Sequence, residues 1–489
     1  MNYEVNSGYC NICDKVVPAS YESRDGKMYL RKECARCGVT ETLLSSDIER
    51  YQKKQEFGKG TFPPSEPRVV VVEVTNTCNL SCPTCMSNMG RESAKFDPPL
   101  EYFDRLFRSL SQRKPPPHIE LFGGEPTTRD DLPAIIALGF QYGLHVCVCT
   151  NGVRLADEEY CRQLLSTGAG IHFQFDGMDS CTYRLLRGNE DLLEKKLTAL
   201  GNTSKYVQTP ISIFCTLARG INDKALTDII EFCRQRRKVV GALYLIPLAR
   251  TWDNGEVQFA WREEERLTVE DVENLVAEKF SGIEFLPAGS MDVPVPFREL
   301  LRPFAAFRGA SPSCESIAFL ISTENGYVPA SEFLKTSFYE LAEDLKKKAS
   351  RNNSDDPKKK DDESARTFWG KILISLWYGS LIRKHVKLDR VFSEKGLKKY
   401  LGMLRLVLNI RSREKRRRIF EEITGKKSIF RLVVLPYQDR FQHQSQCVER
   451  CPVAVGFLDP ENDSVRTIPL CSWRRHRSEI LSKMSRPGA

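Results

Sequence analysis

The chain of 489 residues has no uninterrupted apolar run of the roughly 20 residues that a membrane-spanning helix requires. No apolar stretch follows a charged start, as it would in a secretory signal. Internal repeats are absent as well. We therefore expect a cytoplasmic protein, in which the 17 cysteines do not form disulfides and those that are grouped serve as metal ligands.

The composition indicates a globular protein with more than one hydrophobic core, because 41% of the residues are hydrophobic in a chain of this length. Two or three domains are expected. The net charge of +9 is unevenly distributed, which suits phosphate-bearing partners or an anionic membrane surface. Charge alone does not choose between these partners.

The first two regions of the chain differ in pattern. Residues 1–50 hold two cysteine pairs around an expected strand hairpin, a unit too small to fold unaided. Residues 67–300 alternate β-rich runs with amphipathic stretches such as Leu132–Tyr142 and Asp157–Ser166, which is typical of parallel βα units. Six strands are predicted, and they indicate an α/β fold built as an open, partial (β/α)6 barrel: Val69–Thr75, His118–Phe122, His145–Thr150, Ile171–Phe175, Ile211–Leu217 and Ala242–Ile246.

The third region comprises residues 301–345 and 428–489. It is interrupted at 346–366 by a run of Lys, Asp, Asn and Ser with almost nothing apolar, which predicts a solvated linker. The following residues 367–427 are expected to form a helical insert that contains the densely basic Arg411–Arg418.

Three cysteines, Cys78, Cys82 and Cys85, follow the first predicted strand of the barrel. A loop at the carboxyl end of a strand is where βα barrels carry their active sites. A 4Fe-4S cluster normally takes four thiolates, so a loop that supplies three leaves one iron with an open coordination position. The alternative is a zinc knuckle that awaits a fourth ligand.

Further polar and glycine-rich motifs end the next strands of the barrel. Glycines there allow close backbone approach and unusual turns. The alternative for the Asn-Gly and Asp-Gly pairs is ordinary turn chemistry. The motifs are Gly123-Gly124-Glu125-Pro126 after the second strand, Thr150-Asn151-Gly152 at the end of the third and Gln174-Phe175-Asp176-Gly177 at the end of the fourth.

The cysteine spacing and the Gly-Gly-Glu-Pro motif together resemble the radical S-adenosylmethionine (SAM) superfamily, over Val69 to about Leu248. This resemblance implies a 4Fe-4S cluster on the three cysteines, with SAM bound at the open iron and cleaved reductively to a 5'-deoxyadenosyl radical. It also implies an electron donor such as ferredoxin or flavodoxin. Gly123, Gly124, Glu125 and Pro126 would bind the SAM amino group, and Asn151, Gln174 and Asp176 would lie near its ribose and carboxylate. Beyond the cluster ligands, the sequence names no catalytic residue.

Two C-x2-C pairs, Cys10 with Cys13 and Cys34 with Cys37, are separated by about twenty residues. This spacing is typical of a zinc ribbon or a rubredoxin-like iron site, and four sulfur ligands suit either metal. A structural role is favoured over electron transfer because so small a domain needs a metal to hold it together.

The third region contains Cys314, Cys447, Cys451 and Cys471, each in a polar, Pro-rich or Ser-rich context. Four thiolates can hold an auxiliary 4Fe-4S cluster, and Cys447 is the member with the least support. The remaining cysteines, which lie in strands or in periodic apolar segments, are interpreted as small buried hydrophobes: Cys147, Cys149, Cys161, Cys181, Cys215 and Cys233.

The ribbon, barrel and tail together resemble a narrower subfamily, which includes archaeal tetraether lipid synthases and proteins assigned to methylation of a pterin precursor. Cys10–Thr42, Leu121–Gly188 and Cys451–Trp473 carry this resemblance. One departure concerns Gly38–Thr77, which contains no cysteine, whereas the tetraether synthases bind a further cluster between ribbon and barrel. This chain therefore has one auxiliary cluster fewer, or its reaction differs.

Three functions remain open at this point. The sequence favours carbon-carbon bond formation between lipid alkyl chains, because an apolar helix around Trp369–Tyr378 and the basic Arg411–Arg418 would suit an anionic inner membrane face. A packed amphipathic helix with a solvated basic end is the alternative for those segments. The second function is radical methylation or modification of a pterin-like molecule. The third, a redox-sensing iron-sulfur protein that binds nucleic acid, leaves the open-iron triad unexplained.

Overall fold

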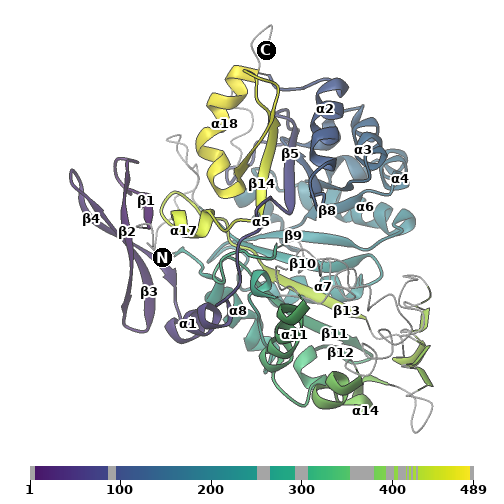
Figure 1. Ribbon diagram of the computed structural model, residues 1–489. Helices are drawn as coiled ribbons and strands as arrows, with labels where there is room; N and C mark the ends of the chain where they lie inside the picture. The colour runs from purple at the N-terminus through teal and green to yellow at the C-terminus, as the bar shows by residue number, and fades with distance from the viewer. Residues whose placement is uncertain are drawn as a thin grey trace.

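The computed structural model describes residues 6–85, 95–249, 265–291, 307–352, 379–392 and 428–484, with short pieces between 401 and 425. These residues form a four-stranded sheet at the N-terminus and an eleven-stranded sheet that makes up most of the molecule (Figure 1).

The small sheet is antiparallel throughout, with its strands in chain order: β1 (Ser7–Tyr9), β2 (Val16–Arg24), β3 (Lys27–Cys34) and β4 (Gly38–Ser45). The predicted hairpin is confirmed as β2 and β3. Asp25 and Gly26 join these strands with φ angles of 51° and 73°, the left-handed conformation that a two-residue type I′ turn requires.

The centre of the large sheet consists of six parallel strands in chain order, as predicted: β5 (Val69–Thr75), β6 (His118–Gly123), β7 (His145–Thr150), β8 (Gly170–Gln174), β9 (Ile211–Leu217) and β10 (Val240–Pro247). Helices follow these strands, and most of them cover one face of the sheet: α2 (Leu100–Ser111), α3 (Leu132–Gln141), α4 (Glu158–Ser166), α6 (Leu192–Tyr206), α7 (Leu226–Gln235) and α8 (Val269–Lys279). The short helix α5 (Ser180–Arg187) lies between β8 and α6 in the chain.

Strand alternation gives the barrel two different faces. Val70, Val72 and Val74 of β5 join the main core under the helices, whereas Val71 belongs to a separate cluster on the other face. On β6, Ile119 and Leu121 likewise point into the main core. Side chains at the intervening positions therefore face the inside of the barrel.

The third region does not form a separate layer, because its strands extend the barrel sheet at both edges. β13 (Ile429–Val434) pairs in parallel with β10, and β14 (Val453–Leu458) pairs in parallel with β5. The sheet is completed by β11 (Ser316–Thr323) and β12 (Gly326–Pro329) beyond β13, and by β15 (Val465–Pro469) beyond β14. The C-terminal region thus flanks the predicted barrel on two sides.

Three helices that lie outside the βα repeats pack on the inner face near both edges. Trp473 of α18 (Leu470–Met484) packs with Val71 and Phe457, and the α18 helix lies beside β14 and β5 in Figure 1. Near the opposite edge, α1 (Ile48–Phe57) and α11 (Phe338–Asn352) contribute to a cluster with Tyr244. The inner face of the middle strands lies between these two packed regions.

The predicted insert is described only in part. Helix α11 continues to Asn352, so the expected linker at 346–366 begins as helix, and its remainder lies outside the described residues. Trp369–Tyr378 also lies outside them, as does Arg411–Arg418 except for Lys415 and Arg418. No helix in the described part of the chain has both the length and the apolar character to cross a membrane. The remaining short helices are η1 (Pro126–Thr128), η2 (Val153–Ala156), η4 (Ala288–Ser290), η5 (Ala330–Phe333), α14 (Leu388–Val391) and α17 (Ser445–Val448).

Candidate active site

The three cysteines of the predicted cluster lie together on the loop after β5. Burial raises the pKa of the Cys78 thiol to about 12, and the neighbouring Cys82 and Cys85 act in the same direction. Burial also raises the pKa of Cys82. Buried thiols of this kind ionise only when a positive charge balances them, which the irons of a cluster supply. The loop therefore fits a metal cluster.

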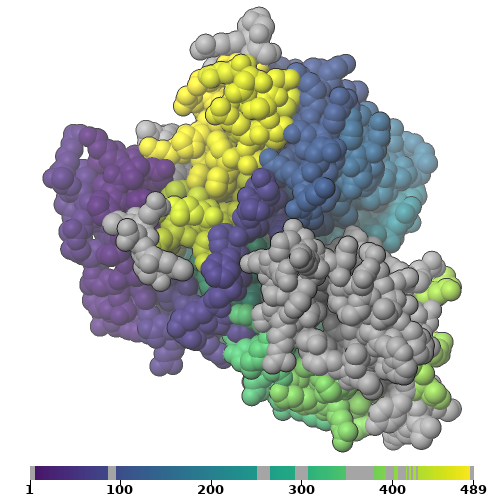
Figure 2. All heavy atoms as spheres, in the orientation of Figure 1, coloured from purple at the N-terminus to yellow at the C-terminus, as the bar shows by residue number. Residues whose placement is uncertain are grey.

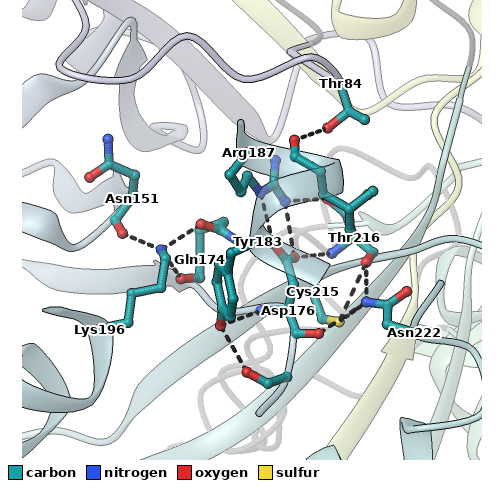
Figure 3. Close-up of polar contacts among 12 residues, drawn as sticks. Thr84, Asn151, Gln174, Asp176, Tyr183, Arg187, Lys196, Cys215, Thr216 and Asn222 are labelled. Atoms are coloured by element: carbon teal, nitrogen blue, oxygen red, sulfur yellow. Dashed lines mark hydrogen bonds and ion pairs between the residues drawn. The ribbon is translucent and has the colours of Figure 1, made fainter. Parts of the chain in front are cut away.

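Contacts with the segment after β8 hold this loop in place. The Thr84 hydroxyl donates a hydrogen bond of 2.9 Å to the carbonyl of Leu186 in α5 (Figure 3). A Cβ atom on Gly188 would lie 3.4 Å from both the Ser81 carbonyl oxygen and Pro83 Cδ, so the end of α5 is in close contact with the loop. The Leu-Leu-Arg-Gly segment thereby supports the cysteines.

Two glycines at the end of β6 allow that strand to touch the start of the cysteine loop. Gly123 has a φ of 143°, and the Gly124 N–H donates to the Thr75 carbonyl at 2.7 Å. A Cβ atom on Gly124 would lie 2.0 Å from the Thr77 carbonyl oxygen, closer than any packed side chain tolerates. Glycine is therefore a steric requirement of the predicted SAM-binding motif.

Replacing Gly124 with alanine is expected to destabilise the enzyme by about 1–3 kcal/mol, because backbone atoms must move to relieve the overlap. Since those atoms begin the cysteine loop, SAM cleavage should fall as well. Gly201→Ala in α6 is the matched control, because no atom lies within 4 Å of its Cβ position and alanine is the better helix former. Denaturation midpoints and the yield of 5'-deoxyadenosine would measure both effects; equal behaviour of the two variants would refute the steric argument.

The Glu125 carboxylate is 1% exposed and accepts hydrogen bonds from three neighbouring residues. Its Oε1 atom accepts from the Thr127 backbone at 3.1 Å and from the Thr127 and Thr150 hydroxyls at 2.6 Å each. Oε2 accepts from the Asn151 N–H at 2.7 Å. The side chain thus joins the end of β6 to the end of β7. Its predicted role toward SAM stays a prediction.

Asn151 connects β7 to the cysteine loop. Its Nδ2 donates to Asn79 Oδ1 at 2.7 Å, and its Oδ1 accepts from the Val153 N–H at 3.0 Å. A residue predicted to lie near SAM therefore contacts the loop that carries the cluster cysteines.

Lys196, which the sequence does not single out, points toward Asn151 and Gln174 (Figure 3). This fully buried side chain donates to the Asn151 carbonyl at 2.6 Å, to the Gln174 carbonyl at 2.8 Å and to Gln174 Oε1 at 2.5 Å. Burial lowers the pKa of Lys196 to about 7, although the negative charge of Asp176 opposes this shift. Lys196 ties the ends of β7 and β8 together.

Asp176 and Arg187 form a buried ion pair beside the cysteines. The Asp176 carboxylate accepts from Arg187 Nε at 2.7 Å, from Arg187 Nη2 at 3.0 Å and from the Thr216 N–H at 3.0 Å. Gln174 Nε2 donates to the same carboxylate. The positive charge of Arg187 favours the thiolate form of Cys82. The pair therefore joins β8, α5 and β9 and places a cation near the cluster loop.

The sequence carried signals for both missed residues. Arg187 belongs to the Leu-Leu-Arg-Gly segment of the resemblance. Lys196 lies on the buried stripe of α6 together with Leu192, Ala199 and Leu200, where an apolar residue is expected. A charge in such a position indicates a specific buried partner.

The N-terminal cysteines form a compact group. The four sulfur atoms of Cys10, Cys13, Cys34 and Cys37 lie within 4.8 Å of one another. Burial opposes ionisation of Cys10, yet the backbone N–H groups of Cys13 and Ile12 lower its pKa to about 7. This arrangement fits a tetrahedral metal site.

The small sheet that carries this site rests against the C-terminal region (Figure 2). Lys32 Nζ donates to the Phe441 carbonyl at 2.6 Å, and Gly8 forms a β-bridge with Gln444. These contacts involve the segment directly before Cys447, which links the ribbon to the predicted auxiliary cysteines.

The fold brings Cys314, Cys447, Cys451 and Cys471, which are scattered in the sequence, close enough to influence one another electrostatically. A hydrogen bond between Cys314 and Cys447 raises the pKa of Cys314 well above its usual value and lowers that of Cys447. Cys314 also experiences the charges of Cys451 and Cys471. Cys447, the member with the least support from the sequence, is thus in direct contact with another member of the group.

Comparisons with known proteins agree with this geometry. Residues 72–233 match the Radical SAM superfamily, and residues 3–46 match the HMPTM N-terminal zinc ribbon domain. The chain is 27% identical to 7,8-dihydro-6-hydroxymethylpterin dimethyltransferase from Methanocaldococcus jannaschii, over 98% of this chain and 95% of that protein. It is 29% identical to a probable GTP 3',8-cyclase from Methanothermobacter marburgensis, over 38% of this chain and 59% of the relative.

A solved structure, Streptococcus suis SuiB bound to S-adenosylmethionine, is similar at a TM-score of 0.34 and 13% identity, over 53% of this chain and 68% of that one. The chain carries a zinc ribbon followed by a radical SAM domain, and the protein is a radical SAM enzyme. Its cofactors are a 4Fe-4S cluster and SAM, which together supply a 5'-deoxyadenosyl radical. The hypothesis of a non-enzymatic nucleic-acid-binding protein is therefore set aside.

Proposed function

We propose that this enzyme methylates a reduced pterin related to 6-hydroxymethyl-7,8-dihydropterin. The observation that carries the proposal is the extent of the similarity to the pterin dimethyltransferase, which includes the ribbon, the barrel and the tail. The match to the GTP cyclase, by contrast, extends over 38% of the chain.

The radical SAM domain accounts for hydrogen abstraction. The residues described above hold the strand ends and the cysteine loop in position for that reaction. Gly123 and Gly124 bring the end of β6 against the cysteine loop, and Asn151 links β7 to the same loop. Lys196 and Arg187 hold the ends of the next strands. Their hydrogen bonds keep the cofactor-facing edge rigid, which favours one orientation of the reactants.

We also propose that Cys314, Cys447, Cys451 and Cys471 hold an auxiliary 4Fe-4S cluster. Their mutual electrostatic interactions and their burial, which is nearly complete for two of them and partial for Cys314 and Cys451, support this assignment, because desolvated thiols in one place require a cation to ionise. The ribbon contacts the segment before Cys447 and so stabilises one side of the group.

The preference of the sequence analysis for lipid coupling is not retained. By its name, the relative that matches the whole chain acts on a pterin, and the apolar segment Trp369–Tyr378 that favoured a membrane surface lies outside the described residues. The alternative with a small heterocyclic substrate has the better support.

The test is an anaerobic assay of the reconstituted enzyme with SAM as the radical source, a separate methyl donor (further SAM labelled at its methyl group, or a reduced pterin that carries a methylene group), dithionite as the reductant and 6-hydroxymethyl-7,8-dihydropterin, analysed by mass spectrometry. We expect 5'-deoxyadenosine together with a pterin heavier by one methylene unit for each methyl group added. A host that lacks the gene should gain methylated pterins on expression, with unchanged lipid cores. Altered lipid cores beside unmodified pterins would contradict the proposal.

A further inference from the structure

The inner face of the middle strands carries a polar and aromatic group that the cofactor site does not use. Glu120 lies on β6, Cys149 on β7 and His172 on β8, each alternating with residues of the main core. Strand register places Cys149 opposite His172, so these side chains share the inner face. Phe214 of β9 and Tyr244 of β10 continue the row.

Glu120 and His172 are paired at the middle of this face. Glu120 Oε2 lies 3.0 Å from His172 Nδ1, and the Cys149 thiol donates to the same oxygen at 3.4 Å. The two side chains keep 16% and 18% of their surface exposed, so they are accessible from inside the barrel. Within the described residues, the Cys149 and His172 contacts to this carboxylate both use Oε2, and we take Oε1 as the atom that meets a ligand.

A stack of rings lies next to this carboxylate. The His172 and Phe214 rings are stacked with centroids 4.7 Å apart, and the Phe214 and Tyr244 rings with centroids 4.6 Å apart and an interplanar angle of 10°. Flat aromatic side chains of this kind favour a planar heterocycle, because they add dispersion and quadrupole interactions to burial.

Glu120, His172 and the neighbouring rings lie deeper in the barrel than the predicted cofactor site, at a depth where a substrate could bind. His172 precedes Gln174 by two residues on the same face, so it lies about 7 Å further from the carboxyl edge of the sheet. Gln174 bonds to Lys196 and Asp176 in the layer next to the cysteine loop. A ring bound at Glu120 would therefore lie inside the barrel, under that layer.

We propose that Glu120, held by His172, recognises the aminopyrimidinone edge of the pterin, while Phe214 contacts the face or edge of its ring system. A carboxylate can accept hydrogen bonds from the exocyclic amine and the adjacent ring N–H of such a heterocycle at the same time. This inference rests on the proposed function and assigns the specificity of that site to residues that neither the cofactor nor the clusters require.

The test is binding of 6-hydroxymethyl-7,8-dihydropterin to the reconstituted enzyme by equilibrium dialysis. Glu120→Gln keeps the shape of the side chain and removes its charge, so Kd should rise by at least about tenfold. SAM cleavage without pterin and the iron content should remain as in the wild type, which shows that the fold is intact. Glu190→Gln, a change to a carboxylate on the surface, is the matched control and should bind pterin normally.

Two results would overturn the inference. One is unchanged pterin affinity in Glu120→Gln while the wild type still methylates pterin, in which case the proposed function stands without this site. The other is a metal ion beyond those of the ribbon and the clusters that is lost in Glu120→Gln, because Glu120, Cys147 and His172 have ligand atoms within 4.8 Å of one another. A wild type that neither binds nor methylates pterin contradicts the proposed function itself.

Discussion

Replacing Cys82 with alanine will abolish the reductive cleavage of SAM, down to the level of an assay without enzyme. The loop after β5 supplies three thiols for a cluster, and two thiols cannot hold the four irons that the chemistry needs. Iron content should fall from about eight to about four atoms per chain, since the auxiliary cysteines are untouched. The measurements are 5'-deoxyadenosine after dithionite reduction, and iron with acid-labile sulfide on protein purified without oxygen.

Cys471→Ala is the matched control for this prediction. It removes one thiol from the group around Cys314, so it should also lose about four irons, but SAM cleavage in the absence of substrate should persist. Cleavage that survives in Cys82→Ala would contradict the assignment of the active-site cluster. A wild-type content of about four irons would contradict the auxiliary cluster and leave the active-site cluster intact.

Replacing Asp176 with asparagine will lower the stability of the barrel by about 3–5 kcal/mol, because the positive charge of Arg187 then stays buried without its partner. The carboxylate also accepts from Thr216 and Gln174, and because asparagine has one acceptor oxygen in place of two, part of this hydrogen bonding at the ends of β8 and β9 is lost as well. Anaerobic chemical denaturation followed by circular dichroism would measure the loss as a lower midpoint. We also expect the cluster to be lost at lower denaturant concentrations, since Arg187 lies near Cys82.

The control for this prediction is Glu158→Gln, which breaks the exposed ion pair between Glu158 and Lys205. Exposed pairs are screened by water and contribute little, so its denaturation midpoint should stay close to that of the wild type. Equal midpoints for Asp176→Asn and Glu158→Gln would contradict the structural importance of the buried pair.

The sequence predicts the barrel strands well because alternation and β-rich composition, the two patterns that indicate them, are both local. Alternation and β-rich composition place the six central strands within two residues of their observed ends, as β9 (Ile211–Leu217) shows. The cysteine triad and the two glycines are also recognisable, because they lie at fixed positions after those strands. Local pattern was sufficient wherever a feature depends on neighbouring residues alone.

The edge strands and the buried network could not be predicted in the same way. Residues 429–434 and 453–458 join the barrel sheet by pairing with β10 and β5, which lie far away in the sequence. Lys196 acquires its role from carbonyls at the ends of two other strands, and Arg187 from the carboxylate of Asp176, two residues after β8. These partners are determined by the tertiary structure, and the helix or strand propensity of a segment gives no information about them.

The placement of β13 and β14 on opposite edges of the central strands has a consequence for synthesis of the protein. During synthesis, β10 presents an unpaired row of backbone amides and carbonyls until β13 has been made, and β5 does so until β14 has been made. The nascent barrel is therefore open to mispairing while its cysteine loop is already exposed. Pairing of both edges of the central strands must therefore wait for the last part of the chain.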